Sequence, residues 1–157
     1  LKEFTGQVIN FSGMTEKEVS KQLCPYGEID PSTLCVMSQP KNIKAEFRYV
    51  ICNKQVVTGS EYRWDNVLDV RSDTHPLCDA MAKKVAEADW QADTVYICDV
   101  ALVETMRVRD GVMCLDKEAK VVELNAFSSS GLYACDTYKI VDAVSKAAWD
   151  EHSGQSV

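Results

Sequence analysis

The sequence predicts an α+β fold in which helices flank an antiparallel β-sheet. Two strand-like segments, 45–52 and 55–60, are separated by only two residues, as in a β-hairpin. Segments 77–86 and 136–149 instead carry apolar residues at helical spacing. The predicted order of elements is typical of α+β folds: a short helix, a hairpin, a helix, further strands and a closing helix.

Composition indicates one globular domain that spans residues 1–157. Hydrophobic residues make up 46% and charged residues 26% of the 157 residues, which argues against disorder. The net charge of −7 argues against nucleic acid as a partner, and the apolar runs are too short to cross a membrane. Because no signal peptide is recognisable, we expect a cytoplasmic protein. The sequence carries no signal for an oligomeric state.

The first part of the chain predicts a short helix and one strand. Thr15, followed three residues later by Glu18, forms a capping box that leads into a helix ending at Cys24-Pro25. Residues 34–38 are apolar enough for a strand, which Pro40 would end.

The hairpin at 45–60 is the clearest local prediction. Alternation places Glu46 and Arg48 on one face and Phe47 and Tyr49 on the other, so one face of the hairpin is charged. A charged face of this kind belongs either to a functional site or to an ordinary solvated surface.

The second half predicts a helix, a buried strand, another hairpin and a closing helix. Pro76 suits the start of the helix at 77–86, and 96–102 is an apolar strand with Asp99 inside it. We expect a second hairpin with its turn at 116–119 and its second strand at 120–124.

The seven cysteines do not predict disulfides or zinc. Their number is odd, they are widely spaced and no Cys-x-x-Cys occurs. Several lie in apolar runs, where a free cysteine behaves as a small hydrophobe. Neither of the two histidines has a cysteine at ligand spacing.

Glu123 and Asn125 are the first candidates for chemistry. In the strand Val121–Asn125 both side chains lie on one face, and carboxylate and amide oxygens suit Mg²⁺. The following Ser-Ser-Ser-Gly, residues 128–131, offers hydroxyl and N–H groups to phosphates. The pattern therefore predicts a Mg-nucleotide site, with an exposed strand face and turn as the alternative.

Asp99 is the second candidate, because a charged carboxylate inside an apolar strand is costly to bury alone. It requires a cation, a metal ion or several hydrogen-bond donors. A salt bridge to an arginine is the purely structural alternative.

Four segments in order resemble the C-terminal part of an ATP-grasp protein, and in particular an uncharacterised ATP-grasp clade of bacteria and phages. They span nearly the whole chain. The segments are Lys2-Glu3-Phe4-Thr5-Gly6, the hairpin from Glu46-Phe47-Arg48 to Glu61-Tyr62-Arg63, Tyr96–Ala101, and Val122–Phe127 with Ser130–Tyr133.

The resemblance implies an ATP-dependent ligase. Such enzymes hold ATP between two α+β subdomains and form an acylphosphate on a carboxylate substrate, a small molecule or a peptide, which an amine or another nucleophile then attacks. By motif position, Asp99, Glu123 and Asn125 would be Mg²⁺ ligands that also bind the nucleotide. Arg48 would be catalytic and neutralise the transferred phosphate. Lys2 and Arg63 would contact phosphate or substrate.

Two departures from the family pattern keep alternatives open. The N-terminal part of the fold and its nucleotide-binding lysine would precede Lys2, so the chain is either a fragment of a ligase or a reduced, non-catalytic module that binds nucleotide or protein. In addition, 23 residues separate Asp99 from Glu123. Either 104–111 is an insertion, or Asp110 or Asp116 replaces Asp99 as the third metal ligand.

Overall fold

The structure, a computed structural model, describes residues 7–24, 27, 30, 32–34 and 36–154. The chain divides into two compact units, Leu1–Pro40 and Lys41–Val157. The first contains helix α1 (Glu16–Leu23), which begins with the predicted capping box. The Thr15 hydroxyl accepts from the Glu18 N–H at 3.4 Å, and the Glu18 carboxylate accepts from the Thr15 N–H at 2.7 Å.

The strand predicted at 34–38 is wrong for the described part of that segment. Residues 34 and 36–38 have no regular structure, and Leu34 and Val36 are each 98% exposed. Cys35 lies outside the described residues. An apolar run becomes a strand only when another strand satisfies its backbone groups, and none of the described residues does so here.

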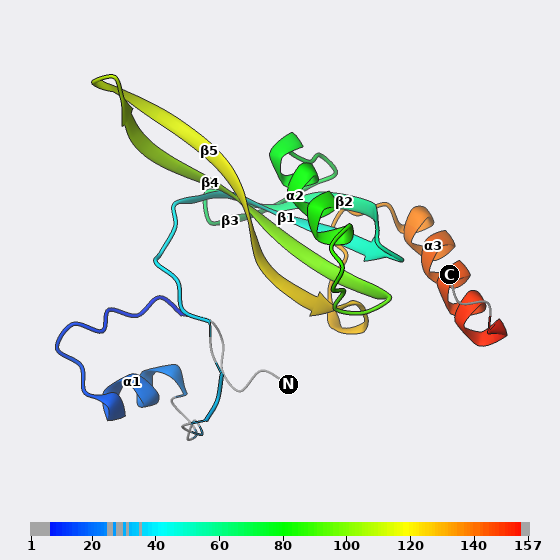
Figure 1. The fold of residues 1–157 in the computed structure, drawn as a ribbon, viewed down its shortest axis with the longest axis horizontal. Helices are drawn as coiled ribbons and strands as arrows, with labels where there is room; N and C mark the ends of the chain where they lie inside the picture. The colour runs from blue at the N-terminus through cyan, green and yellow to red at the C-terminus, as the bar shows by residue number, and fades with distance from the viewer. Residues whose placement is uncertain (1–6, 25–26, 28–29, 31, 35, 155–157) are drawn as a thin grey trace. The chain divides into compact units, whose positions relative to one another are not determined.

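The second unit is a five-stranded antiparallel sheet with helices on both faces, which confirms the predicted fold class (Figure 1). The strand order is β3-β2-β1-β4-β5, and each neighbouring pair is antiparallel. The elements are β1 (Ile43–Cys52), β2 (Gln55–Trp64), β3 (Val67–Arg71), α2 (Pro76–Ala86), β4 (Val95–Arg109), β5 (Val112–Ala126), the short 3₁₀ helix η1 (Phe127–Ser129) and α3 (Thr137–Ser153).

Strands β1 and β2 form the predicted hairpin around Asn53-Lys54. Both turn residues have positive φ angles, 49° and 61°, as a two-residue turn that matches the sheet twist requires. The pairing continues to Ala45 opposite Trp64 and is interrupted by bulges. One bulge leaves Tyr62 as an extra residue between the pairs Glu46–Arg63 and Phe47–Glu61.

The predicted turn of the second hairpin is wrong. The chain turns at Asp110-Gly111, with φ angles of 51° and 76°, and Asp116 lies inside β5 opposite Thr105. Asp-Gly is a favoured two-residue turn, whereas the charged run at 116–120 is a partly buried stretch of a strand. Segment 104–111 is therefore the end of β4 and its turn, not an inserted loop.

The predicted helices are confirmed, with α3 ending four residues later than expected. Helix α2 begins at Pro76 behind His75, whose side chain accepts from the Leu77 N–H. Helix α3 begins behind Asp136, which accepts from the N–H groups of Tyr138 and Lys139.

The two faces of the sheet bury different side chains because alternate residues point to opposite sides. The face under α2 is apolar and includes Phe47, Tyr49 and Cys98. The face under α3 combines Val50 and Ile97 with buried polar groups, among them Arg48 and Asp99. The charged face predicted for the first hairpin is therefore covered rather than solvated.

Among the residues that the structure describes, no helix is long and apolar enough to cross a membrane. The described cysteines are all free: Cys24, Cys52, Cys78, Cys98, Cys114 and Cys135.

We expect Cys78 and Cys98 to resist thiol reagents in the native protein. Both are fully buried, and burial raises the pKa of each thiol to about 12, so the reactive thiolate is scarce at pH 8. Cys24 and Cys114 are only partly buried and should react first. Mass spectrometry after brief alkylation, with and without denaturant, checks this. Early labelling of Cys98 in the native protein would contradict the buried strand.

Gly59 should not tolerate a side chain. A Cβ at this position would lie 2.5 Å from the Tyr49 ring, and the Tyr49 hydroxyl is held by Asp79 at 2.8 Å. We expect Gly59→Ala to lower the free energy of unfolding by about 1–3 kcal/mol in urea denaturation. Gly131→Ala is the control, because its Cβ would meet no atom within 4 Å. Equal stability of the two variants would contradict the close packing on Tyr49.

Candidate functional site

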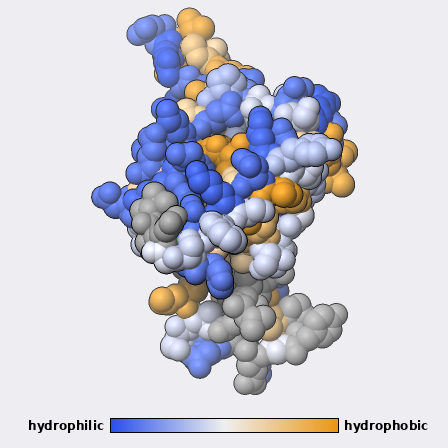
Figure 2. All heavy atoms as spheres, turned by 90° about the vertical axis from the view of Figure 1, so that its right-hand side faces the viewer, coloured by the Kyte–Doolittle hydropathy of each residue, from blue (hydrophilic) through white to orange (hydrophobic). Residues whose placement is uncertain are grey.

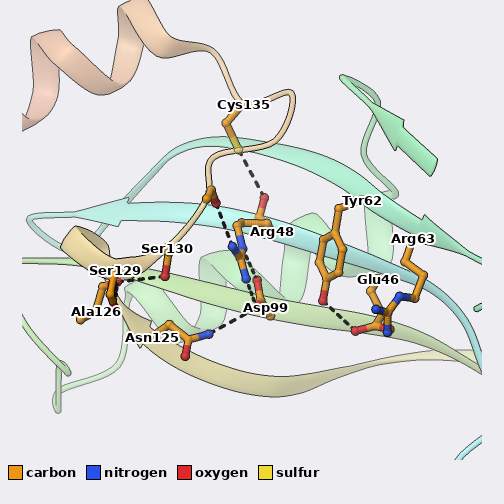
Figure 3. Close-up of polar contacts among 11 residues, drawn as sticks. Glu46, Arg48, Tyr62, Arg63, Asp99, Asn125, Ala126, Ser129, Ser130 and Cys135 are labelled. Carbon is orange, nitrogen blue, oxygen red and sulfur yellow. Dashed lines mark hydrogen bonds and ion pairs between the residues drawn. The ribbon is translucent and has the colours of Figure 1, made fainter. Parts of the chain in front are cut away.

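The centre of the polar face is a two-pronged salt bridge between β1 and β4. Arg48 lies opposite Asp99 in the strand register, so the two side chains emerge on the same face. Arg48 Nε donates to Asp99 Oδ1 at 2.8 Å and Nη2 donates to Oδ2 at 2.6 Å (Figure 3). Both residues are buried, with 8% and 1% exposure. The predicted structural alternative for Asp99, an arginine partner, is therefore realised.

The loop after β5 closes over Arg48. Arg48 Nη1 donates to the backbone carbonyl of Gly131 at 2.8 Å, and the Cys135 thiol lies 3.7 Å from the carbonyl oxygen of Arg48. The loop is tied to the end of β5, because Ser130 Oγ donates to the carbonyl of Ala126 at 2.9 Å. Arg48 is thus held by one strand and one loop.

Two tyrosine rings lie beside the guanidinium of Arg48. Tyr62 and Tyr133 are stacked with ring centroids 4.8 Å apart and nearly parallel planes. The Arg48 Cζ lies 5.5 Å from the Tyr62 centroid and 4.9 Å from the Tyr133 centroid, within the range of cation–π attraction. Tyr133 has a φ of 50°, which is unusual for a bulky residue and is maintained by this packing.

Glu123 and Asn125 lie beside Asp99 on the neighbouring strand. Glu123 is opposite Asp99 and Asn125 is opposite Ile97, so both point to the face that carries Arg48. Asn125 Nδ2 lies 3.4 Å from Asp99 Oδ2, and Figure 3 shows the amide oxygen directed away from that contact. The expected grouping of Asp99, Glu123 and Asn125 is therefore present in the strand register.

A second ion pair lies on the same face. Glu46 accepts from the Tyr62 hydroxyl at 2.7 Å and from Arg63 Nη1 at 2.9 Å. The bulge at Tyr62 allows these two successive residues of β2 to reach the same carboxylate. Arg63 stays 44% exposed at its side chain, so part of its guanidinium faces solvent.

Neighbouring carboxylates act on the ionisation of Asp99. Burial raises the pKa of Asp99, and the carboxylates of Glu123 and Glu46 act in the same direction, against the lowering by Arg48. The hydrogen bond to Asp99 raises the pKa of Arg48, which stays protonated. The ionised form of Asp99 therefore depends on the compensation that Arg48 provides.

The donor set fits a hard divalent cation. Asp99 and Glu123 contribute carboxylates and Asn125 an amide oxygen, and Mg²⁺ takes oxygen ligands from few carboxylates together with phosphates. Asp99 keeps acceptor capacity beyond its two bonds to Arg48, because an ionised carboxylate has about four lone-pair positions. In the part of the chain that the structure describes, no three His, Cys, Asp or Glu side chains form a metal-binding group. The Asn125 amide presents its nitrogen to Asp99, so its side chain would have to rotate to bring the oxygen to an ion held beside Asp99.

The other residues predicted for the site have different positions. Asp116 is paired with Arg109 at 2.7 Å, opposite Thr105, which is six residues from Asp99 along β4. At about 3.3 Å per residue that is roughly 20 Å, and Asp110 in the turn is farther still. Of the three alternatives for the third ligand, only Asp99 lies beside Glu123. Lys2 lies outside the described residues.

Sequence reasoning missed the roles of Tyr62, Tyr133 and Glu46 in this site. Tyr62 reaches the polar face only because of a bulge, and Tyr133 does so through a left-handed backbone in a loop. Neither feature has a reliable local signal. Alternation places Glu46 on the correct face, but its partners Tyr62 and Arg63 are on another strand.

Compared with models of protein families, the chain matches the ATP-grasp domain, R2K clade family 2, over residues 2–143. The predicted resemblance is therefore confirmed. An ATP-grasp domain supports nucleotide binding and the general ligase type of activity. No curated protein and no solved structure matches the chain.

We expect Arg48→Lys to be strongly destabilising. A lysine cannot reproduce the two-pronged bond to Asp99 together with the bond to Gly131, so the buried carboxylate loses most of its compensation. The expected loss in the free energy of unfolding is about 3–5 kcal/mol, measured by urea denaturation.

Arg109→Lys is the matched control for that substitution. Arg109 also binds an aspartate at 2.7 Å, but its side chain is 64% exposed, so the cost should stay below about 1 kcal/mol. If both variants lost a similar free energy of unfolding, burial of the Arg48–Asp99 pair would not make it more important for stability than the exposed Arg109–Asp116 pair.

Proposed function

Because the chain belongs to the ATP-grasp domain R2K clade family 2, we propose that it is an ATP-dependent carboxylate ligase or the catalytic part of one. The observation that carries the proposal is the grouping of Asp99, Glu123 and Asn125 on adjacent strands, next to Arg48. The reaction would transfer the γ-phosphate of ATP to a carboxylate, and a nucleophile such as an amine would then displace phosphate from the acylphosphate.

Asp99, Glu123 and Asn125 would hold Mg²⁺. Bound there with ATP, the ion would neutralise charge on the phosphate oxygens. Glu123 and Asn125 would be the main ligands, because Asp99 already binds Arg48. Asp99 would supply its remaining acceptor capacity.

Arg48 would orient the transferred phosphate. A guanidinium has five N–H donors, and three are used by Asp99 and Gly131. The remaining two belong to Nη1 and Nη2 and would donate to phosphate or carboxylate oxygens. Fixed by a carboxylate, a carbonyl and two tyrosine rings, this cation needs little reorganisation during the reaction, which is the main requirement of electrostatic catalysis.

Arg63 would be a second contact for phosphate or substrate. One nitrogen of Arg63 donates to Glu46. Because the Arg63 side chain is partly exposed, its other nitrogens are accessible. Lys2 remains a proposed phosphate contact, since the structure does not describe it.

The first test is nucleotide binding. At 100 times its dissociation constant, Mg-ATP should stabilise the protein by roughly 2.7 kcal/mol, which raises the melting temperature by about 5–11 °C. Glu123→Gln should remove the Mg²⁺-dependent part of this shift, and EDTA should do so in the unchanged protein.

Glu118→Gln is the matched control. Glu118 lies on the same face of β5, opposite Val103 and away from Asp99, and is paired with Lys120 at 3.1 Å. Its substitution should leave the shift intact. A shift that is insensitive to Glu123, or equally sensitive to Glu118, would place the nucleotide elsewhere.

The ligase step has a separate test. With hydroxylamine as the nucleophile, a carboxylate activated as an acylphosphate gives a hydroxamate, and ADP and phosphate are released. A panel of amino acids, dicarboxylates and short peptides should include a substrate whose hydroxamate formation requires Mg²⁺ and Glu123. ATP binding without hydroxamate from any member would favour a nucleotide-binding module over a ligase.

A further inference from the structure

A cavity of about 660 Å³ lies at the outer edge of β2, between α2 and the start of α3. It opens to solvent, and its volume is within the range of small-molecule sites. Among the described residues that line it, none belongs to the group of Arg48, Asp99, Glu123 and Asn125. Figure 2 faces the end of the sheet that carries α3, where hydrophilic side chains surround smaller hydrophobic areas.

Three lysines from three different elements line this cavity. Lys54 belongs to the turn between β1 and β2, Lys83 to α2 and Lys139 to α3. The three residues are far apart in the chain, so it is the fold that brings them to one cavity. Each lysine carries three N–H donors and no acceptor.

Three carboxylates also line the cavity, and two of them already have donors from the protein. Asp79 accepts from the hydroxyls of Tyr49 and Thr74, at 2.8 and 3.2 Å. Asp136 accepts from two N–H groups at the start of α3, at 3.1 and 3.2 Å. The third carboxylate, Glu87, is exposed. The acidic side chains at the cavity therefore already have structural roles or face solvent.

The lysines keep hydrogen-bond capacity for a ligand. Lys139 Nζ lies 3.6 Å from Asp136, and Lys83 Nζ lies 3.8 Å from Glu87. Charge-assisted N–H···O bonds are about 2.7–2.9 Å long, so neither pair is a direct hydrogen bond. The side chains of Lys139 and Lys83 are 66% and 72% exposed, so both ammonium groups can turn toward a bound molecule.

The backbone of Gly59 adds a further donor to the cavity. The N–H of Glu61 points to the outer edge of β2, where it donates to the carbonyl of Asp73 at 3.0 Å. Because backbone groups alternate in direction along a strand, the N–H of Gly59 points to the same edge. Strand β3 pairs with β2 from Glu61 to Trp64, so it does not cover Gly59.

We propose that this cavity binds a small molecule through a carboxylate or phosphate group. The oxygens of that group accept hydrogen bonds from the three lysines and from the N–H of Gly59. Because three lysines and three carboxylates line the cavity, directed hydrogen bonds hold the anion, not an excess of positive charge. The site does not depend on the ligase activity, since it uses no residue of the proposed Mg²⁺ or phosphate contacts.

The test is NMR titration of the ¹⁵N-labelled 157-residue protein with malonate and, separately, with inorganic phosphate, in EDTA and at constant ionic strength. The Gly59 amide resonance should shift and saturate, with a dissociation constant of about 0.1–10 mM for an anion held by a few hydrogen bonds. The probe that binds more tightly identifies the ligand group as carboxylate or phosphate. Malonamide, which is uncharged, should cause no saturable shift. If neither anion shifted Gly59 in a saturable way, the proposal would be overturned.

Two neighbouring lysines of α2 provide matched variants. Lys83 lines this cavity, whereas Lys84 lines a different, apolar cavity beside Trp90. Lys83→Gln should weaken anion binding by about five-fold or more, and Lys84→Gln by less than about two-fold. Both lysines are exposed, so both variants should fold, which thermal melts check. Equal weakening by the two substitutions would mean that only general charge attracts the anion, and would overturn the proposal.

Glu123→Gln separates this cavity from the proposed nucleotide site. Anion binding at Gly59 should be unchanged in this variant, whether or not the chain binds Mg-ATP. Loss of the Gly59 shift in Glu123→Gln would show that the anion binds at the proposed nucleotide site instead, and the separate cavity would be rejected.

Discussion

The buried salt bridge between Arg48 and Asp99 is the constraint on which the polar face of this domain depends. Removing both charges from water is costly, and the cost is offset only when geometry and additional hydrogen bonds are favourable. The two-pronged bond, the carbonyl of Gly131 and two tyrosine rings together provide this compensation. The loop after β5 must therefore close over Arg48, and its closure places Ser130 and Tyr133 beside the site.

Two β-bulges in the sheet bring the side chains of the site together. The extra residue at Tyr62 brings two successive side chains to Glu46, and the extra residue at Val122 occurs directly before Glu123. Bulges bend a strand and redirect its side chains, and they are frequent next to functional sites. Because β1, β2, β4 and β5 are all long, they hold the redirected side chains firmly despite the local interruptions.

Local signals explain what the sequence predicts well. The cap at Thr15, the two-residue turn at Asn53-Lys54 and the helix entry at Pro76 each depend on neighbouring residues only, and each is confirmed. The turn at Asp110-Gly111 also has a local signal, but the charged run at 116–120 suggested a different position. The strand at 34–38 failed because strand formation depends on a partner elsewhere in the chain.

Part of the site is predictable from the sequence, because the alternation of side chains along a strand shows which residues share a face of the sheet. Glu123 and Asn125 share a face by spacing alone, whereas their position beside Asp99 depends on the register of β4 against β5. That register also explains why Asp99 has two roles. It compensates Arg48, yet burial, Glu123 and Glu46 leave its negative charge only partly stabilised. A site assembled in this way keeps an arginine fixed beside carboxylates, and the phosphoryl transfer that we propose would require positive charge from both the arginine and a bound cation.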